Sequence, residues 1–371
     1  MVADGGLLLR STLASGAAPG ETVAVLHLVR DHRWSAGTVL PFGVLLCLVL
    51  ALPLLAVRLW PADAESGDYV EIGAVRTGGG AGGEPAPEES GPDASTGSYT
   101  EDCGHNLEGH RNSDNVVISP GVVGGAHHVH DYVGNLSTDA LATDASLAAA
   151  GTTCTGGDRS SYYWPVLRRT DRDGDRAAGQ DGAPGHGGQD GQDGHGNVGE
   201  ILTPDTVTVE FRGNPWSKVV PMPRFLRLLE GNPTAATDGG AEARARWGCT
   251  GYPGRTTDRY PLCPAGSLLT RTLDFPSCWD GRGTDSPDHR THAVFPSATG
   301  VCPHRTFPIP HLRVTLGYRP PPGRAFALDA FPEQHHSPRT DHGVFIGVMT
   351  DDRMAALVAC LNQNHSCRES G

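Results

Sequence analysis

The sequence predicts a mainly β fold with long loops and few short helices, as a single disulfide-stabilised extracytoplasmic domain behind one N-terminal transmembrane helix. Three features of the 371-residue chain lead to this prediction. Short β-branched runs are separated by 50 Gly and 29 Pro residues, a pattern typical of strands and turns. A segment near the N-terminus is apolar over the ~20 residues that a bilayer-spanning helix needs. Of nine cysteines, Cys47 lies in that segment and the other eight follow it, and an even number suits disulfides in an oxidising compartment.

The N-terminal region is expected to anchor the chain in the cell membrane. Residues 1–35 are interpreted as a cytoplasmic leader and 36–60 as a single-pass anchor, which is uncharged as far as Val57. Arg30 and Arg33 precede the apolar run, and such positive charges stay on the cytoplasmic side. The alternative is a cleaved signal peptide, because Ala-Asp-Ala at 62–64 resembles a cleavage site. Both interpretations place the remaining chain outside the cytoplasm.

Two segments have compositions that cannot form a core. Residues 61–101 are rich in Gly, Pro, Glu and Ser, which predicts a disordered linker. Residues 170–199 repeat Asp-Gly and Gly-Gln-Asp units and are predicted to be a disordered insertion. The folded extracytoplasmic domain is therefore expected over 102–371, with this insertion inside it.

Within that domain, strands are expected to outnumber helices. The runs with strand character are 115–118, 206–211, 292–295 and 312–316. A helix is predicted over 353–362, with Asp351 or Asp352 as its N-cap. A second, short helix is predicted over 225–230.

The eight cysteines outside the apolar run are expected to form four disulfides. They are Cys103, Cys154, Cys249, Cys263, Cys278, Cys302, Cys360 and Cys367. Zinc binding by these thiols is less favoured because no Cys-x-x-Cys pair occurs in the sequence. Cys360–Cys367 and Cys249–Cys263 are plausible local pairs by separation, and the full connectivity stays open.

Charge and motifs exclude several functions. The formal net charge of −13 argues against nucleic acid as a partner, since phosphate binding needs a basic surface. The sequence contains no Gly-x-Ser-x-Gly elbow, phosphate-binding glycine loop or His-Glu-x-x-His motif. A standard serine hydrolase, nucleotide enzyme or zincin is therefore disfavoured.

A first cluster of chemically active residues lies at 127–131. In a strand, His128 and His130 would share one face, while His127 and Val129 would point away. Two imidazoles on one face predict half of a metal site or an acid–base pair, and Asp131 is expected to hydrogen-bond a neighbouring imidazole. The alternative is a loop whose histidines only satisfy backbone groups.

A second cluster follows about 160 residues later, in a loop that leads into a strand. Asp288 and His289 are interpreted as an acid–base pair and His292 as a third imidazole. Trp279 precedes them and is suited to stacking on a sugar ring, or to packing in the core beside a disulfide. The two clusters are expected to meet at one site.

A third histidine group lies near the C-terminus. His335 and His336 are expected on the surface. His342 follows Asp341 and precedes an apolar, strand-like run at 344–346.

Several ordered sequence blocks resemble one known family. They are 118–121, 128–135, 160–165, 223–227, 275–281, 286–292, 302–303 and 308–310. In this order they resemble the DUF1996 family, a secreted domain of unknown function in fungi and actinobacteria, over about residues 103 to 367. The family pattern is similar to His-x-Asp-Phe where this chain has His342-Gly343-Val344-Phe345, so Asp341 is the carboxylate left to replace the missing one. The resemblance implies a polar, histidine-lined cleft and supplies no reaction.

Three functions are carried forward from the sequence. The first is an enzyme acting on a polysaccharide or other cell-wall polymer. Its catalytic residues would be His128, His130, Asp131, Asp288, His289 and His292, and its substrate-binding residues Tyr162, Trp164, Trp279 and His342. The second is a site for a divalent metal such as zinc or copper, with His128, His130 and His292 as candidate ligands, although nothing in the sequence requires a cofactor. The third is a non-catalytic module that binds wall glycan.

Overall fold

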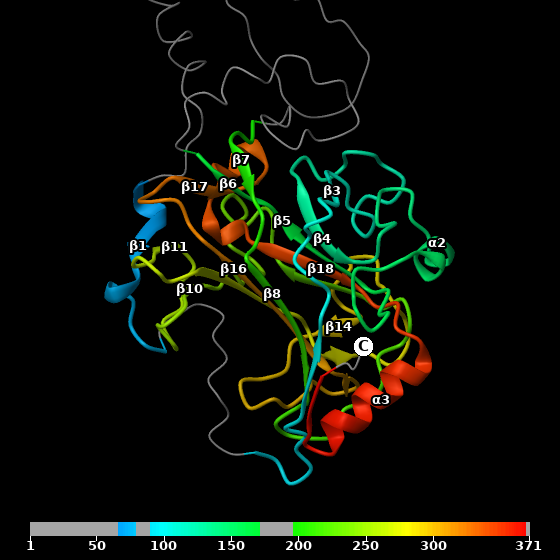
Figure 1. Cartoon of the computed structure of the whole chain (residues 1–371). Helices are drawn as coiled ribbons and strands as arrows, with labels where there is room; N and C mark the ends of the chain where they lie inside the picture. The colour runs from blue at the N-terminus through cyan, green and yellow to red at the C-terminus, as the bar shows by residue number, and fades with distance from the viewer. Residues whose placement is uncertain (1–65, 79–89, 171–195, 369–371) are drawn as a thin grey trace, which may run out of the picture. The chain divides into compact units, whose positions relative to one another are not determined.

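The structure is a computed structural model that describes residues 66–78, 90–170 and 196–368 (Figure 1). Within these residues no helix is both long and apolar enough to cross a bilayer. The predicted leader (1–35), the predicted anchor (36–60) and most of the predicted insertion (170–199) lie outside the described residues. The described part is mainly β with few helices, as the sequence predicts.

Two sheets form the centre of the fold. The six-stranded sheet has the order β10 (Trp247–Cys249), β12 (Leu269–Asp274), β16 (His311–Tyr318), β8 (Thr206–Arg212), β2 (Ser98–Glu101) and β19 (Ser366–Arg368). The five-stranded sheet has the order β3 (Arg111–Asn112), β4 (His130–Gly134), β5 (Ser161–Pro165), β18 (His342–Ile346) and β9 (Arg227–Gly231). Pairing within the five-stranded sheet is antiparallel throughout. Figure 1 shows β4, β5 and β18 side by side.

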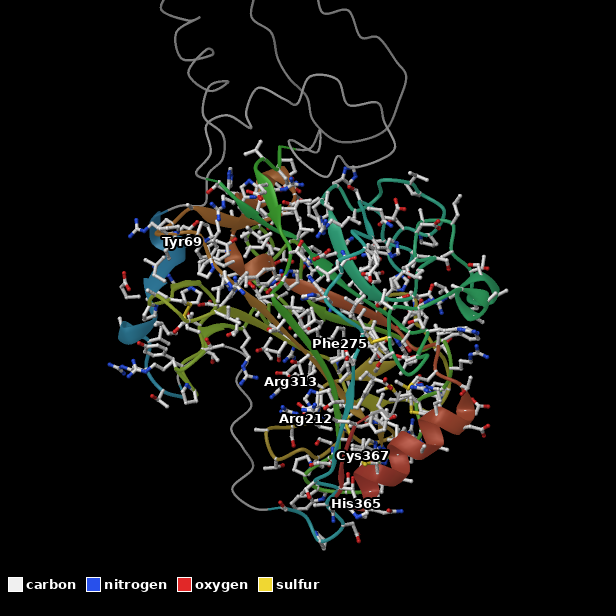
Figure 2. All side chains as sticks on the ribbon, in the orientation of Figure 1. Tyr69, Arg212, Phe275, Arg313, His365 and Cys367 are labelled. Atoms are coloured by element: carbon white, nitrogen blue, oxygen red, sulfur yellow. A yellow bond between two sulfur atoms is a disulfide. The ribbon has the colours of Figure 1, made fainter. Side chains whose placement is uncertain are left out.

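The largest core lies between these two sheets. Strand β12 alternates buried and half-buried residues, and most of β16 does so too, as expected when one face of a sheet packs inward. Leu273 and Val314 share one apolar cluster with Trp164 and Phe345 of the five-stranded sheet. Phe275, labelled in Figure 2, belongs to the same cluster. Sheet-on-sheet burial of this kind is the main stabilising term of the fold.

The other face of the five-stranded sheet is also covered. Tyr132, Tyr163 and Val344 point to this face and form a second apolar cluster with Val117 and Leu147, which come from the loop before β4 and from helix α2 (Asp144–Ala149). Strands β4, β5 and β18 are therefore buried on both faces.

Three smaller sheets complete the described fold. They are β1 (Tyr69–Glu71) with β11 (Tyr260–Leu262); β14 (Ala293–Val294), β13 (Cys278–Trp279) and β15 (Phe307–Pro308); and β17 (Phe326–Leu328), β6 (Leu167–Arg169) and β7 (Glu200–Leu202). Short 3-10 helices cover Ser66–Asp68, Ile72–Ala74, Pro332–Gln334 and Pro338–Thr340.

The predicted linker is wrong where the structure describes it. Within 61–101, β1 pairs with β11, and β2 lies between β8 and β19. Tyr69 is in the main core, and its hydroxyl donates to the Phe326 carbonyl. Composition misses these strands because their partners lie far away in the sequence.

Two local predictions are also wrong. Residues 115–118 form turns because the Asn115 side chain accepts the backbone N–H groups of Val117 and Ile118. The expected helix at 225–230 is largely strand β9, since its leucines are buried on the two faces of the sheet beside β18.

The C-terminal helix is confirmed as α3 (Asp351–Asn362). Thr350, not Asp351 or Asp352, is its N-cap, and the two acids occupy the first turn, where carboxylates complement the helix dipole. Met354, Leu357 and Leu361 are buried in the main core. Strands are confirmed at 206–211 and 312–316, and the run at 292–295 contributes only the two residues of β14.

The prediction of four disulfides is confirmed. The pairs are Cys103–Cys154, Cys249–Cys263, Cys278–Cys302 and Cys360–Cys367. The two local pairs expected from their separation are among them.

Candidate functional site

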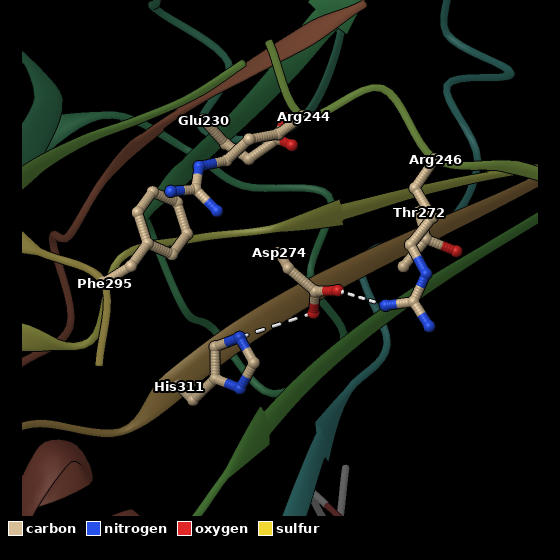
Figure 3. A pocket seen from close by; sticks show the side chains of 7 residues that line it. All are labelled: Glu230, Arg244, Arg246, Thr272, Asp274, Phe295 and His311. Carbon is tan, nitrogen blue, oxygen red and sulfur yellow. Dashed lines mark hydrogen bonds and ion pairs between the residues drawn. The ribbon is translucent and has the colours of Figure 1, made fainter. Parts of the chain in front are cut away.

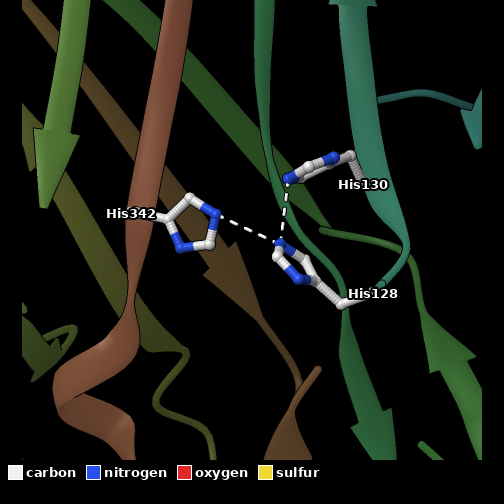
Figure 4. Close-up of side chains that lie close together, drawn as sticks. All are labelled: His128, His130 and His342. Carbon is white, nitrogen blue, oxygen red and sulfur yellow. Dashed lines mark hydrogen bonds between the residues drawn. The ribbon is translucent and has the colours of Figure 1, made fainter. Parts of the chain in front are cut away.

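Three imidazoles converge on the outer face of the five-stranded sheet. The Nε2 atom of His128 lies 3.1 Å from Nε2 of His130 and 3.2 Å from Nε2 of His342. Figure 4 shows the three rings pointing toward one another from β18 and from the segment that enters β4. We call these residues the three-histidine cluster.

The sheet register brings the distant histidine into the cluster. His130 opens β4 and pairs with Pro165 of β5. His342 opens β18, which flanks β5 on its other side with Val344 opposite Tyr163. Continuing this register by two residues places His342 opposite Pro165 as well. His130 and His342 therefore lie on either side of the same end of β5. His127 has a φ of 57°, and this left-handed residue turns the chain before His128.

Backbone carbonyls fix the orientation of two of the rings. Nδ1 of His130 donates to the Asp114 carbonyl at 2.9 Å, and Nδ1 of His342 donates to the Thr340 carbonyl at 2.8 Å. A carbonyl only accepts, so Nδ1 carries the hydrogen in both rings. In the neutral tautomer Nε2 then has a free lone pair directed at His128.

Burial keeps the three rings uncharged near neutral pH. The exposed fractions of His128, His130 and His342 are 2%, 0% and 6%. Burial lowers the pKa of His130 to about 3, with a further contribution from His342. Burial also lowers the pKa of His342 to about 4 and that of His128 well below its ordinary range. Neutral imidazole is the form that ligates metals.

The separations suit one small metal ion. Two nitrogens bound to the same tetrahedral zinc at about 2.0–2.1 Å lie roughly 3.3 Å apart. Among the described residues, no fourth His, Cys, Asp or Glu joins the cluster. The ring of Phe331 packs edge-to-face on His128, 5.3 Å away between centroids. The described geometry therefore offers three neutral nitrogen ligands beside an aromatic wall.

The loop before β4 supports this arrangement through Asp114. Its carboxylate accepts the backbone N–H of Gly124 at 2.7 Å and that of Ala140 at 2.9 Å. Its carbonyl orients His130. Asp114 therefore links the loop before β4 to the His130 ring.

The predicted second cluster does not join the first. His289 binds Asp285 through Nδ1 at 2.9 Å. Asp288 is exposed and closes its own loop by accepting from Ser286 and Thr291. His292 is buried between the Ser286 hydroxyl and the Arg227 carbonyl, at the opposite end of β9 from Gly231, which pairs with His342. Among the described residues, no hydrogen bond or ion pair links these side chains to the three-histidine cluster, and His342 takes the place expected for His292.

Asp131 also lies away from the imidazoles. It follows His130 on the strand and so points to the opposite face. There its carboxylate accepts from Asn106 and from Arg111 Nε at 3.0 Å. Burial raises the pKa of Asp131 to about 6 although Arg111 lowers it. This aspartate belongs to a structural ion pair.

The aromatic residues expected to bind substrate are in structural positions. Tyr162 and Trp164 are buried in the main core, because they face the six-stranded sheet. Trp279 packs against that core beside the Cys278–Cys302 disulfide, and its Nε1 donates to the Gly283 carbonyl. For Trp279 the second sequence interpretation, core beside a disulfide, describes the structure.

The sequence missed His342 as the partner of His128 and His130. A usable signal was present, since each of the two buried strands begins with a histidine. The two strands do not pair with each other but lie on either side of β5. Because that arrangement is decided by the whole sheet, the signal could not identify a partner.

The family comparison covers most of the described domain. The sequence model of the family described as "Domain of unknown function (DUF1996)" matches residues 115–340. No curated protein and no solved structure matches the chain significantly. The matched range contains His128 and His130 and ends just before His342.

Proposed function

The chain belongs to the DUF1996 family, whose description assigns no chemistry, and on that premise we propose that its three-histidine cluster binds a transition-metal ion, zinc(II) by preference. The observation that carries this proposal is the convergence of three buried Nε2 atoms, 3.1 and 3.2 Å from the central one. Imidazole is a preferred ligand of zinc and copper.

Hydrogen bonds among the three rings cannot satisfy all of their Nε2 lone pairs, and a cation at the centre would do so. With Nδ1 of His130 and His342 held by carbonyls, neither neutral ring has a hydrogen on Nε2. His128 Nε2 can donate one hydrogen to only one of the two. Its Nδ1 makes no hydrogen bond of good geometry among the described residues, although the Ala126 carbonyl is close enough to raise its pKa slightly. A cation at the centre would engage all three lone pairs.

The metal proposal is better supported than acid–base attack on a wall polymer. The acid–base mechanism needs Asp288 or Asp131 beside the histidines, and both are engaged elsewhere. A three-nitrogen site retains a coordination position for water or a ligand, and zinc in such a site lowers the pKa of bound water to about 7. Polymer hydrolysis thus remains a proposal only in a metal-dependent form.

We also propose that the domain lies outside the cell, behind a membrane anchor at 36–60. The four disulfides support an oxidising compartment, and the uncharged run supports the anchor. A tag placed after Arg368 should be removed by protease added to intact cells. A tag that stays protected until the cells are lysed would refute this placement.

The metal proposal is tested by titrating the purified full-length protein with Co²⁺ and Zn²⁺. We expect one ion per chain, intense visible absorption from tetrahedral Co²⁺, and displacement of Co²⁺ by Zn²⁺. His128→Ala, His130→Ala and His342→Ala should each weaken binding by roughly 100-fold or more, since each removes a ligand.

Two histidines outside the cluster provide matched controls. His289→Ala removes a half-buried imidazole from the second cluster, and His335→Ala removes an exposed one. Both variants should bind Co²⁺ as the wild type does. Equal loss in controls and ligand variants, or unchanged binding when all three cluster histidines are replaced, would refute the proposal. Tighter binding of Cu²⁺ in a tetragonal geometry would reassign the metal.

A further inference from the structure

A separate charged pocket opens on the face of the five-stranded sheet opposite the three-histidine cluster. Its lining residues are Glu230, Arg244, Arg246, Thr272, Asp274, Phe295 and His311 (Figure 3). Glu230 on β9 pairs with Gly343, whereas the next residue, Gly231, pairs with His342. Because neighbouring residues of a strand point to opposite faces, the pocket and the histidine cluster lie on different sides of the sheet.

The carboxylate of Asp274 is already neutralised within the pocket wall. Arg246 donates to it at 2.7 Å and Arg313 at 2.9 Å, and His311 Nε2 lies 3.3 Å away. Burial would raise the pKa of Asp274, but hydrogen bonds from His311 and Arg313 hold it well below the ordinary value. The charge of Asp274 is therefore already compensated by Arg246 of the pocket and by Arg313, which does not line it.

Arg244 brings a further positive charge to the pocket. Among the described residues its guanidinium is in no ion pair within 4.0 Å, and the nearby carboxyl on which its charge acts is that of Glu230. Its guanidinium lies flat on Phe295, with Cζ 3.4 Å from the ring centroid. Figure 3 shows this stacking. Its Nε is buried and makes no hydrogen bond among the described residues. Stacking fixes the plane of the guanidinium while its edge stays available for a planar, two-oxygen acceptor.

Glu230 adds a buried carboxyl group to the pocket lining. Its side chain is buried with an exposed fraction of 2%, and Oε2 has no hydrogen-bond partner in the described part of the chain. Burial, with the nearby charges of Asp341 and Asp274, raises its pKa well above the ordinary value. The positive charge of Arg244 acts in the opposite direction and lowers this pKa. When protonated, the Glu230 carboxyl can donate a hydrogen bond to a ligand oxygen.

From this arrangement we infer that the pocket binds the carboxylate of a small acidic ligand, such as a uronic acid. Arg244 would bind both carboxylate oxygens through its edge, and the carboxylic acid of Glu230 would donate to one of them. The positive charge of the Arg244 guanidinium favours an anionic ligand over a neutral one. The Phe295 ring, already covered by Arg244 on one side, holds the guanidinium in place.

The test measures binding of D-glucuronate to the full-length protein by calorimetry or ligand-observed NMR, with D-glucose as the neutral analogue. We expect glucuronate to bind and glucose to bind at least ~10-fold more weakly. Arg244→Gln should weaken glucuronate binding roughly 30-fold, and Arg244→Lys about 10-fold, because lysine keeps the charge but loses the planar fork. Glu230→Gln keeps a neutral donor and should retain binding within about 3-fold.

Arg224 is a matched control for Arg244. It also stacks on a phenylalanine, with Cζ 4.9 Å from the Phe225 centroid, and it does not line the pocket. Arg224→Gln should leave glucuronate binding unchanged. Equal binding of glucose, equally tight binding of inorganic phosphate, or the same effect from Arg224→Gln and Arg244→Gln would overturn the assignment. Co²⁺ binding should be unchanged in Arg244→Gln, which separates failure here from failure of the metal site.

Discussion

At the scale of single residues, the structure buries charged and titratable groups in defined roles. Arg271 and Asp341 form an ion pair in which both side chains are fully buried, and Arg271 also donates to the Pro165 carbonyl. The pair lies at the start of β18, where His342 follows Asp341, and contacts the Pro165 end of β5. Removing one partner of a buried ion pair is strongly destabilising, because it leaves the other charge buried and uncompensated. The pair therefore helps to fix the end of the sheet that positions His342.

Glu101 gives a pH dependence whose sign follows from its surroundings. The residue is buried, and Arg353 is its ion-pair partner at 3.4 Å. Burial raises the pKa of Glu101 to about 7, and Asp158 adds to this effect. An acid with a raised folded-state pKa contributes stability below its unfolded-state pKa, and that contribution is lost as pH rises through the folded value.

We therefore predict that Glu101→Gln becomes more stable relative to wild type as pH rises from 4.5 to 8. The relative gain in unfolding free energy should be about 1–2 kcal/mol, discounted for partial solvent screening. Urea unfolding at several pH values measures it. A difference between the two proteins that does not change with pH would contradict the prediction.

At the scale of elements, the sequence predicts the features that depend on residues close together in the chain. The two-residue period of a strand predicts that His128 and His130 point the same way. Their Nε2 atoms are 3.1 Å apart, although only His130 is in β4 and His128 lies in the bend before it. The sequence predicts a short helix at 225–230, but a short apolar stretch fits a helix or a strand. Its pairing with β18, more than 100 positions away, decides the outcome. For the same reason the sequence predicts His292 as the third imidazole, whereas in the structure it is His342 that lies beside His128.

Gly231 shows how closely β9 and β18 approach at the histidine cluster. Its φ is 73°, and a Cβ there would lie 2.2 Å from the Asp341 carbonyl and 2.8 Å from Cα of His342. Only glycine fits both the left-handed conformation and this contact.

We predict that Gly231→Ala lowers the unfolding free energy by about 2–4 kcal/mol and weakens Co²⁺ binding, because the start of β18 must move. Gly157→Ala is the matched control, since Gly157 has a φ of 84° with open space around it. The control should cost only about 1 kcal/mol and leave Co²⁺ binding intact. Equal effects of the two substitutions, measured by denaturation and metal titration, would show that the contact is unimportant.

At the scale of the whole molecule, the fold is stabilised by the four disulfides and by the apolar core between the two large sheets. The sequence predicted the number of disulfides, because cysteine parity is a property of composition. It could not predict the pairs Cys103–Cys154 and Cys278–Cys302, which depend on the tertiary fold. It also missed that the segment before Cys103 supplies strands to two sheets.

The disulfides should differ in their contribution to stability according to the loops they close. Cys103–Cys154 spans 51 residues and Cys360–Cys367 spans 7. Replacing the first pair by serine should cost about 4 kcal/mol, and replacing the second about 2.4 kcal/mol, from chain entropy. Guanidinium unfolding under oxidising conditions compares the two double variants. A larger loss from the short loop would contradict the entropic explanation.

The position of β18 affects how the domain must be cut for expression. A fragment trimmed to the matched range of 115–340 would retain His128 and His130 and discard His342 together with a central strand of its sheet. A fragment that begins at Cys103 would lack β2, which lies between β8 and β19. The backbone hydrogen-bonding groups of β8 would then be exposed at a sheet edge, which favours aggregation. A failure of either truncated product to bind metal would reflect the cut, so soluble expression trials should begin ahead of Ser66 and end after Arg368.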